Sequence, residues 1–154
     1  MLRYRIAFAA SIAALCAGMS GHATARAIGD LNPKAITITL PSDIKWIKSA
    51  ASERAVLYGD PSKPGYYVVL QKWLPHNNSR PHKHPNARYI TVLSGTWWVQ
   101  TGAKYDPAGF KPVPAGSFVV HAANEIHYDG ARDEPALLEI AGMGPDTNTP
   151  AEEK

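Results

Sequence analysis

The stretch RPHKHPNARY (residues 80–89) places two histidines one residue apart between two prolines. Side chains two residues apart on an extended chain point to the same face, so the imidazoles of His82 and His84 can reach one common point. The flanking prolines stiffen the backbone and reduce the entropy lost when the pair converges on an ion. Paired histidines are also common on protein surfaces, so this motif indicates a metal site only if a further partner joins it.

The segments on either side of this stretch have the composition of short β-strands. They are rich in β-branched and aromatic residues and are separated by turn signals such as GDPSKPG, LPHNNSRP and VPAG. Short strands at regular spacing within one domain are typical of an all-β sandwich, jelly roll or barrel. The expected strands comprise residues 35–40, 54–59, 65–73, 88–94, 96–101, 116–121, 125–130 and 136–142.

Residues 1–27 have the pattern of a signal peptide. A basic start and a short apolar run are followed by small residues, with Ala25 and Ala27 at the spacing that a signal peptidase accepts. We therefore predict cleavage after Ala27, or else after Ala25, and a periplasmic or secreted protein. The apolar run is too short for a membrane span, and Leu15 before Cys16 is not the small residue of a lipoprotein cleavage site, so we expect no stable membrane anchor.

Loss of the signal peptide would change the charge and the chemistry of the chain. The full chain has 16 Lys and Arg against 13 Asp and Glu, and three of its arginines lie in residues 1–27. The remaining charge is balanced, so we expect no nucleic-acid partner. Cys16 is the only cysteine, which leaves the mature chain without disulfides or thiolate ligands. Residues 28–154 suffice for one domain, with its core at about 35–145 and a flexible tail after it.

In the spacing of its histidines and glycines the chain resembles the cupin superfamily. The first cupin motif reads G, five residues, H-x-H, three or four residues, E, six residues, G; the second reads G, five residues, P-x-G, two residues, H, three residues, N. The spacing is kept without insertions over roughly residues 35–145. The positions that match are His82, His84, Gly95, Gly116 and His127. The positions that depart are His76, Arg88, Ala122, Asn124 and Ala131.

The resemblance implies a fold and a metal site. The fold is a double-stranded β-helix, or jelly-roll cupin barrel, inside which His82, His84 and His127 converge. Three neutral imidazoles suit one divalent transition metal, namely Zn, Fe, Mn, Ni or Cu. The alternative is a metal-free barrel whose histidines are hydrogen-bonded to their neighbours. Family members often pair through edge strands, so the resemblance also implies a homodimer.

The resemblance leaves the activity open, because one fold carries many functions. As an enzyme, a mononuclear metal-dependent oxidoreductase or isomerase, the protein would act on a small oxygenated or carboxylated molecule at the three-histidine metal. As a non-catalytic module, it would use the same metal to bind or sense a small ligand. Proton-transfer groups beside the metal would favour the enzyme. Glu125 and Tyr128 flank His127 and are the candidates for that role.

Arg88 stands where many cupins have a metal-binding glutamate. A guanidinium has no free lone pair, so the site keeps at most three protein ligands. If the strand is regular, Arg88 faces the interior, where a cation beside a metal requires an anion. We expect Glu139 to pair with it; otherwise Arg88 lies at the rim, or it holds a substrate carboxylate or phosphate. His121 either orients a ligand or is simply hydrogen-bonded or exposed.

Export gives the first testable expectation. Mass spectrometry of the protein from the periplasm or the culture medium is expected to show a chain that begins at Ile28 or Arg26, because signal peptidase removes the preceding residues. Recovery of the intact chain from Met1 in the cytosol would refute export.

Overall fold

The computed structural model describes residues 31–154, so the predicted signal peptide and Cys16 lie outside the described residues. The chain divides at Ile38 into two units, and the second unit, Thr39–Lys154, contains the strands of the described part. Within residues 31–154 there is no helix of the length and apolarity needed to cross a membrane.

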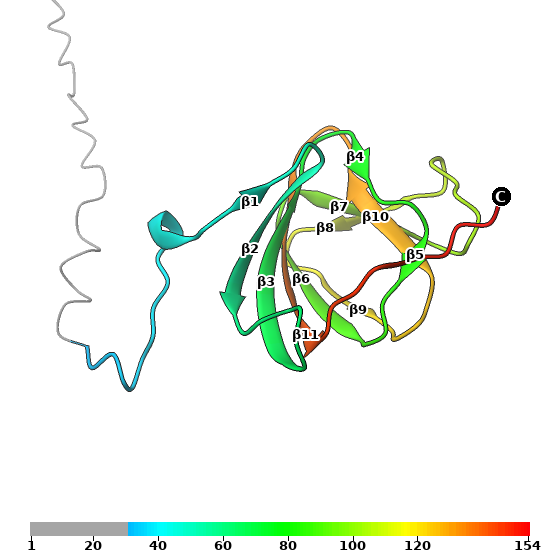
Figure 1. Cartoon of the computed structure of the whole chain (residues 1–154). Helices are drawn as coiled ribbons and strands as arrows, with labels where there is room; N and C mark the ends of the chain where they lie inside the picture. Colours follow the sequence, from blue (N-terminus) through cyan, green and yellow to red (C-terminus); the bar gives the residue numbers. More distant parts are fainter. Residues whose placement is uncertain (1–30) are drawn as a thin grey trace, which may run out of the picture. The chain divides into compact units, whose positions relative to one another are not determined.

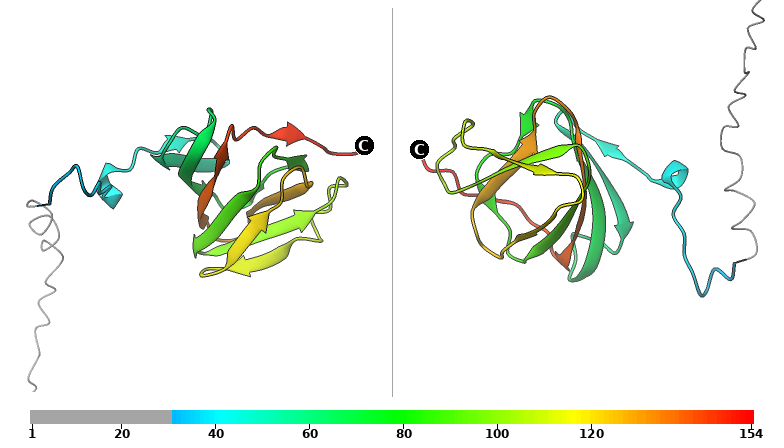
Figure 2. Two further views of the ribbon diagram at one scale, coloured as in Figure 1. Left: turned by 90° about the horizontal axis from the view of Figure 1, so that it is seen from below. Right: turned by 180° about the vertical axis from the view of Figure 1, so that it is seen from behind.

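Two antiparallel sheets pack face to face in the second unit (Figures 1 and 2). One sheet has the strand order β1-β2-β3-β11-β6-β9, and the other has the order β12-β5-β10-β7-β8, with β4 also paired to β10. The elements are η1 (Pro41–Asp43), β1 (Ile47–Lys48), β2 (Ser52–Tyr58), β3 (Gly65–Trp73), β4 (Asn77–Asn78), β5 (His82–Lys83), β6 (Arg88–Ser94), β7 (Thr96–Thr101), β8 (Lys111–Pro114), β9 (Phe118–His121), β10 (His127–Ala131), β11 (Ala136–Gly144) and β12 (Thr149–Pro150). This architecture confirms the expected all-β double-stranded β-helix.

The long strand β11 shows how alternation sets the two faces of the first sheet. It pairs with β3 on one side and with β6 on the other. Leu138 and Ile140 are buried, whereas the alternating residues Leu137, Glu139 and Ala141 are only partly buried, as in a strand with one face covered. The inward-facing residues of both sheets form one core, in which each fully buried large side chain stabilises the fold by about 1.5–3 kcal/mol. The core residues are Tyr67, Val69, Ile90, Val92, Trp97, Ala131, Ala136, Leu138 and Ile140.

Agreement with the expected strands varies along the chain. The strands expected at 65–73, 88–94 and 96–101 have the observed bounds of β3, β6 and β7. The strand expected at 35–40 is wrong: residues 33–35 form a turn, in which the amide of Ala35 donates to the carbonyl of Asn32 at 2.9 Å. Ile36 and Ile38 in this segment are exposed. Their β-branched composition does not yield a strand here because a strand also requires a hydrogen-bonded neighbour.

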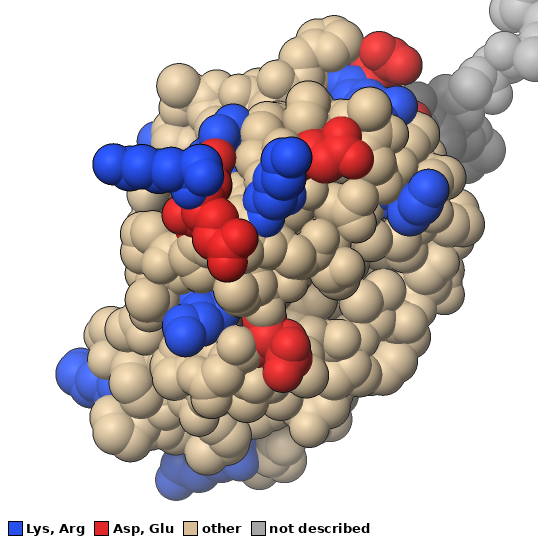
Figure 3. All heavy atoms as spheres, turned by 90° about the vertical axis from the view of Figure 1, so that its right-hand side faces the viewer, with Lys and Arg blue, Asp and Glu red and all other residues tan. Residues whose placement is uncertain are grey.

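The outer face of the first sheet is rich in exposed apolar side chains. Tyr89 on β6, which is half exposed, has Val120 of β9 and Ala141 of β11 as its cross-strand neighbours. Exposed apolar side chains that are grouped on one face of a sheet in this way are typical of an interaction site. The exposed large apolar residues on this face are Tyr58, Tyr66, Tyr89, Leu93, Phe118, Val120 and Met143. A different side of the molecule, shown in Figure 3, carries basic and acidic side chains that are interspersed.

Two glycines with left-handed backbones provide a matched test of the fold. Gly95 joins β6 to β7 at φ +72°, and a Cβ there would lie 2.1 Å from the carbonyl oxygen of Pro135. Gly116 has φ +86°, and a Cβ there would meet open space. Both alanine variants incur the cost of a left-handed backbone, about 1–2 kcal/mol, but only Gly95→Ala adds the collision. Chemical denaturation is expected to show the larger loss of unfolding free energy for Gly95→Ala. Equal losses would contradict the close approach of the two loops.

Candidate metal centre

Three histidines from two neighbouring strands and a loop meet inside the barrel. His82 in β5 is directly opposite His127 in β10, and His84 follows just beyond β5. One nitrogen from each ring lies within 4.8 Å of the others, and each residue is at most 6% exposed. The structure therefore brings together the three residues that the motif spacing predicts.

The three rings are oriented by the same kind of hydrogen bond. Each Nδ1 lies 2.8–3.0 Å from a backbone carbonyl oxygen. A carbonyl only accepts hydrogen bonds, so each Nδ1 carries the proton and each Nε2 keeps its lone pair. The acceptors for His82, His84 and His127 are the carbonyls of Arg80, Thr147 and Glu125, respectively.

Two of these histidines, His84 and His127, are in the protonation state that a metal ligand requires. Burial is the main cause that lowers the pKa of His84 to about 4 and the pKa of His127 to about 4. Both rings are therefore neutral at neutral pH. The Nε2 atom of His84 is also buried without a hydrogen-bond partner among the described residues, which is costly unless a cation or water meets it. The donor set thus fits a divalent transition metal.

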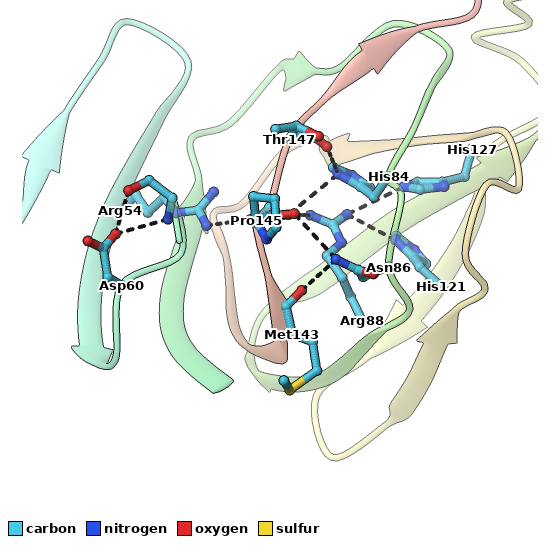
Figure 4. Close-up of polar contacts among 12 residues, drawn as sticks. Arg54, Asp60, His84, Asn86, Arg88, His121, His127, Met143, Pro145 and Thr147 are labelled. Carbon is cyan, nitrogen blue, oxygen red and sulfur yellow. Dashed lines mark hydrogen bonds and ion pairs between the residues drawn. The ribbon is translucent and has the colours of Figure 1, made fainter. Parts of the chain in front are cut away.

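His121 differs from the other three buried histidines. Its Nδ1 lies 3.1 Å from Nη2 of Arg88 (Figure 4), and because a guanidinium only donates, this Nδ1 is the acceptor. Burial lowers the pKa of His121 to about 3, and the neighbouring His127 contributes to the shift. Its Nδ1 lone pair is engaged, so His121 is a hydrogen-bonded neighbour of the three-histidine group. The same Arg88 nitrogen lies 3.4 Å from Nε2 of His127.

The carboxylate beside Arg88 is Asp146. Arg88 is 7% exposed, which excludes the rim position, and its Nη1 lies 3.7 Å from Oδ1 of Asp146. The expected pair with Glu139 is not formed, because Glu139 is opposite Thr91 on the outer face of the sheet. Alternation along the strands puts Arg88 and Glu139 on opposite faces of the sheet. This corrects the expected Arg88–Glu139 pair.

The two candidates for proton transfer, Tyr128 and Glu125, lie in different places relative to the three histidines. Tyr128 follows His127 on β10, so its ring points to the other face of the sheet. Its hydroxyl accepts from the amide of Asp106 at 2.9 Å and donates to the carbonyl of Lys104 at 3.2 Å. The expectation that Tyr128 serves the metal site is therefore corrected. Glu125 is exposed, and together with His127 it lines an open hollow of about 560 Å³.

A second hollow of about 190 Å³ adjoins His82 and His84 on the inner side of the barrel. Its walls carry the two arginines, a tryptophan and several neutral polar groups. Asp129 in this wall is fully engaged: its Oδ2 accepts from the indoles of Trp73 at 3.1 Å and Trp97 at 2.9 Å, and its Oδ1 lies 3.2 Å from the Ser79 hydroxyl. Besides these residues, the lining includes Arg54, Gln71, Arg88, Asp146 and Asn148.

The residues from 145 onward were expected to form a flexible tail, and this expectation is wrong. They run from the end of β11 across to β5, where β12 pairs with His82 and Lys83 (Figure 1). Asp146 and Thr147 of this segment reach Arg88 and His84, which sequence reasoning missed. The signal that could have found Asp146 is the buried arginine: Asp129 of β10 also lines the hollow, but its oxygens are engaged by Trp73, Trp97 and Ser79, so a second carboxylate beside Arg88 was to be expected.

Solved structures with the same fold support this architecture, although no family model and no curated protein sequence matches the chain. The polyketide cyclase RemF from Streptomyces resistomycificus superimposes with a TM-score of 0.63 at 12% identity, covering 77% of this chain and 87% of that one. A double-stranded β-helix protein from Klebsiella pneumoniae gives 0.58 at 18% identity, with 77% and 99% covered. A cupin-2 domain protein from Rhodospirillum rubrum gives 0.56 at 16% identity, with 74% and 78% covered. The chain thus has the fold of the cupin superfamily.

Proposed function

We propose that this protein binds one divalent transition metal through His82, His84 and His127 and uses it to hold a small oxygenated or carboxylated molecule. The observation that carries the proposal is the common orientation of the three rings: each Nδ1 donates to a backbone carbonyl, which leaves the Nε2 atoms for the centre, with a 3.4 Å contact from Arg88 at Nε2 of His127. Lone pairs repel one another, so three of them facing one buried point favour a cation between them. Zn, Fe, Mn, Ni and Cu all accept imidazole ligands.

The charge of the surrounding residues supports an anionic or oxygen-rich ligand. Two arginines, Arg54 and Arg88, face two carboxylates, Asp129 and Asp146, around the inner hollow. The charges of these four residues balance, and the neutral ring of His84 adds none. A divalent ion would therefore bring an uncompensated charge that a carboxylate or another oxygen ligand would reduce. Arg88 would add a guanidinium suited to orient such a group.

The chemistry at this site would be that of a bound metal acting as a Lewis acid or an oxygen-activating centre. The protein's own residues would bind and orient the ligand in a hollow whose walls include the buried side chains of His82, His84 and Arg88. This supports a mononuclear oxidoreductase or isomerase, and steady turnover of an oxygenated small molecule by the metal-loaded protein would establish it. Fold likeness does not choose the reaction, since the fold is shared by many activities.

A specific observation favours the alternative, a non-catalytic binding or sensing module. Both carboxylates of the inner hollow have partners: Asp129 accepts from two indoles and a hydroxyl, and Oδ2 of Asp146 binds Arg54 at 2.6 Å, although Oδ1 of Asp146 has no hydrogen-bond partner among the described residues. Glu125, the remaining candidate acid or base, is exposed. Ligand binding without turnover in the metal-loaded protein would support the module.

The apolar outer face of the first sheet supports a homodimer. Surfaces of this kind are usually covered in an assembly, because burial of apolar area is the main driving force of association. We therefore propose that the mature protein, exported as its N-terminal pattern predicts, pairs through this face. Sedimentation velocity would test the pairing: a monomer at micromolar concentration would exclude a stable dimer.

Metal analysis tests the site itself. The purified protein is expected to carry about one divalent ion per chain, and His84→Ala is expected to lose it, because two remaining histidines bind a metal weakly. His76→Asn is the matched control, since His76 is exposed in a loop and asparagine tolerates its left-handed backbone, φ 60°. A variant with all three ligands replaced by alanine that still holds stoichiometric metal would refute the site.

Replacement of Arg88 tests whether its charge opposes the metal. Arg88→Met removes a cation beside the histidines and the contact at Nε2 of His127, so metal affinity is expected to rise about tenfold or more, the scale of a unit charge a few ångströms away. The unfolding free energy is expected to fall, because Asp146 loses one of its partners. Arg88→Glu restores the usual carboxylate and is expected to tighten metal binding further.

Arg54→Met is the control for the Arg88 variants. It also takes a partner from Asp146, but no hydrogen bond or ion pair of the described residues links Arg54 to the three histidines. Isothermal titration with zinc is expected to show a much smaller change for Arg54→Met than for Arg88→Met. Similar changes in the two variants would mean that the effect passes through Asp146 alone.

A further inference from the structure

The segment of residues 145–152, here called the strap, is fastened to both sheets. At its start the amide of Asp146 donates to the carbonyl of Pro61, in the loop between β2 and β3, at 2.7 Å. Further along, Thr149 and Pro150 pair with β5. At its end the amide of Ala151 donates to the carbonyl of Pro81 at 2.9 Å. The strap therefore spans from the first sheet to the second.

An exposed ion pair adds a side-chain fastening at the end of the strap. The Nε atom of Arg80 donates to Oε2 of Glu152 at 2.8 Å, and Nη2 of Arg80 also contacts Oε1 of Glu152. This two-point geometry is the one in which a guanidinium binds a carboxylate most specifically. Arg80 is also the residue whose carbonyl accepts from Nδ1 of His82. The fastening thus lies two residues from a candidate metal ligand.

The strap acts on the three-histidine group unequally. The carbonyls that orient His82 and His127 lie two residues before each histidine, so these two rings are oriented locally. The carbonyl that orients His84 belongs to Thr147, which lies in the strap and is 63 residues away in sequence (Figure 4). Without the strap, Nδ1 of His84 would lose its acceptor, and the ring could adopt the other tautomer or turn away.

The strap also forms part of the wall of the inner hollow. Asp146 and Asn148 line this hollow, and the Oδ1 atom of Asp146 lies 3.5 Å from Nδ1 of His84 and 3.7 Å from Nη1 of Arg88. One short segment thus orients a candidate ligand, places the anion that partners the buried arginine and encloses the space where a small molecule would lie. Displacement of the strap would disturb all three.

From these contacts we infer that the strap is a positioning element of the metal centre, so that strap closure and metal binding are linked. Thr147, through its carbonyl, is the positioning residue for His84. The inference rests on the proposed metal-binding function. By linkage, if the closed strap raises the affinity for the metal by some factor, the metal favours the closed strap by the same factor.

Zinc titration of strap variants tests one direction of this linkage. Deletion of residues 146–154 is expected to lower zinc affinity about 10- to 100-fold, the usual effect of losing the partner that orients a metal-binding histidine. Glu152→Gln, which weakens only the exposed fastening, is expected to lower it about two- to fivefold. Glu153→Gln is the matched control: it neutralises the adjacent carboxylate, which is exposed, and is expected to leave affinity unchanged.

Hydrogen exchange on the unaltered protein tests the other direction. Saturating zinc is expected to slow exchange of the strap amides, those of Asp146 and Ala151 among them, more than exchange of amides in the core of the first sheet. A purely structural strap would not respond to zinc in this way. This measurement and the Glu152→Gln titration remain decisive if the deleted chain does not fold.

The outcomes separate the inference from the function on which it rests. Failure of the unaltered chain to bind zinc or any of the divalent ions of iron, manganese, nickel and copper would overturn the proposed metal site and the inference together. Equal zinc affinity in the unaltered chain and in a folded deletion variant would overturn the inference alone. If the deletion variant is unfolded, unchanged affinity in Glu152→Gln together with unchanged strap exchange on adding zinc would do the same.

Discussion

Burial of the Arg88 guanidinium inside an apolar barrel costs several kcal/mol unless anions and hydrogen-bond acceptors lie close to it. Burial itself lowers the pKa of Arg88, and Asp129 and Asp146 oppose this shift. The acceptors come from Nδ1 of His121 and, at longer range, Nε2 of His127. The nearer carboxylate, Asp146, comes from outside the barrel strands. The buried charge therefore explains why residues after β11 pack against the site.

The same charge distinguishes the four buried histidines from one another. His121 gives its Nδ1 lone pair to Arg88, whereas His82, His84 and His127 bond carbonyls through Nδ1, and of their Nε2 atoms only that of His127 has a contact with Arg88, at 3.4 Å. In a site with a glutamate at position 88, the carboxylate would complete the ligand set. Here a donor takes that place, so the proposed centre has three histidines and a cation beside them. The positive charge of Arg88 would lower the affinity of the site for a metal cation, and an anionic ligand would reduce this repulsion.

Those features of this arrangement that depend on neighbouring residues could be predicted from the sequence. The bounds of β3, β6 and β7 follow from β-branched and aromatic runs that end at turn residues such as Gly65 and Gly95. The three ligands follow from motif spacing. Alternation alone would have excluded the expected Arg88–Glu139 pair, because Leu138 and Ile140, on either side of Glu139, are buried residues of β11. The same argument separates Tyr128 from His127.

What the sequence did not indicate depends on contacts between distant segments. Residues 145–152 contain two prolines and small polar residues, a composition typical of a tail, and they acquire their order from backbone hydrogen bonds to Pro61 and Pro81. The residue pattern of a short segment does not predict backbone hydrogen bonds to residues that are distant in the sequence. The strand expected at residues 35–40 is the opposite case. Ile36 and Ile38 favour a strand, but this segment pairs with no strand among the described residues. In both segments, hydrogen bonding to a distant part of the chain had more influence on the structure than local propensity.

The position of the three histidines between two hollows bears on what the site can do. His82 and His84 border the inner hollow with its arginines, whereas His127 and His121 border the more open hollow beside Glu125. A metal on the three rings would thus be reachable from solvent on one side and would face a charged, largely buried space on the other. The strap closes only the inner side, because Asp146 and Asn148 line that hollow. Retention of a ligand would therefore depend on the strap, while exchange of water would depend on the open side.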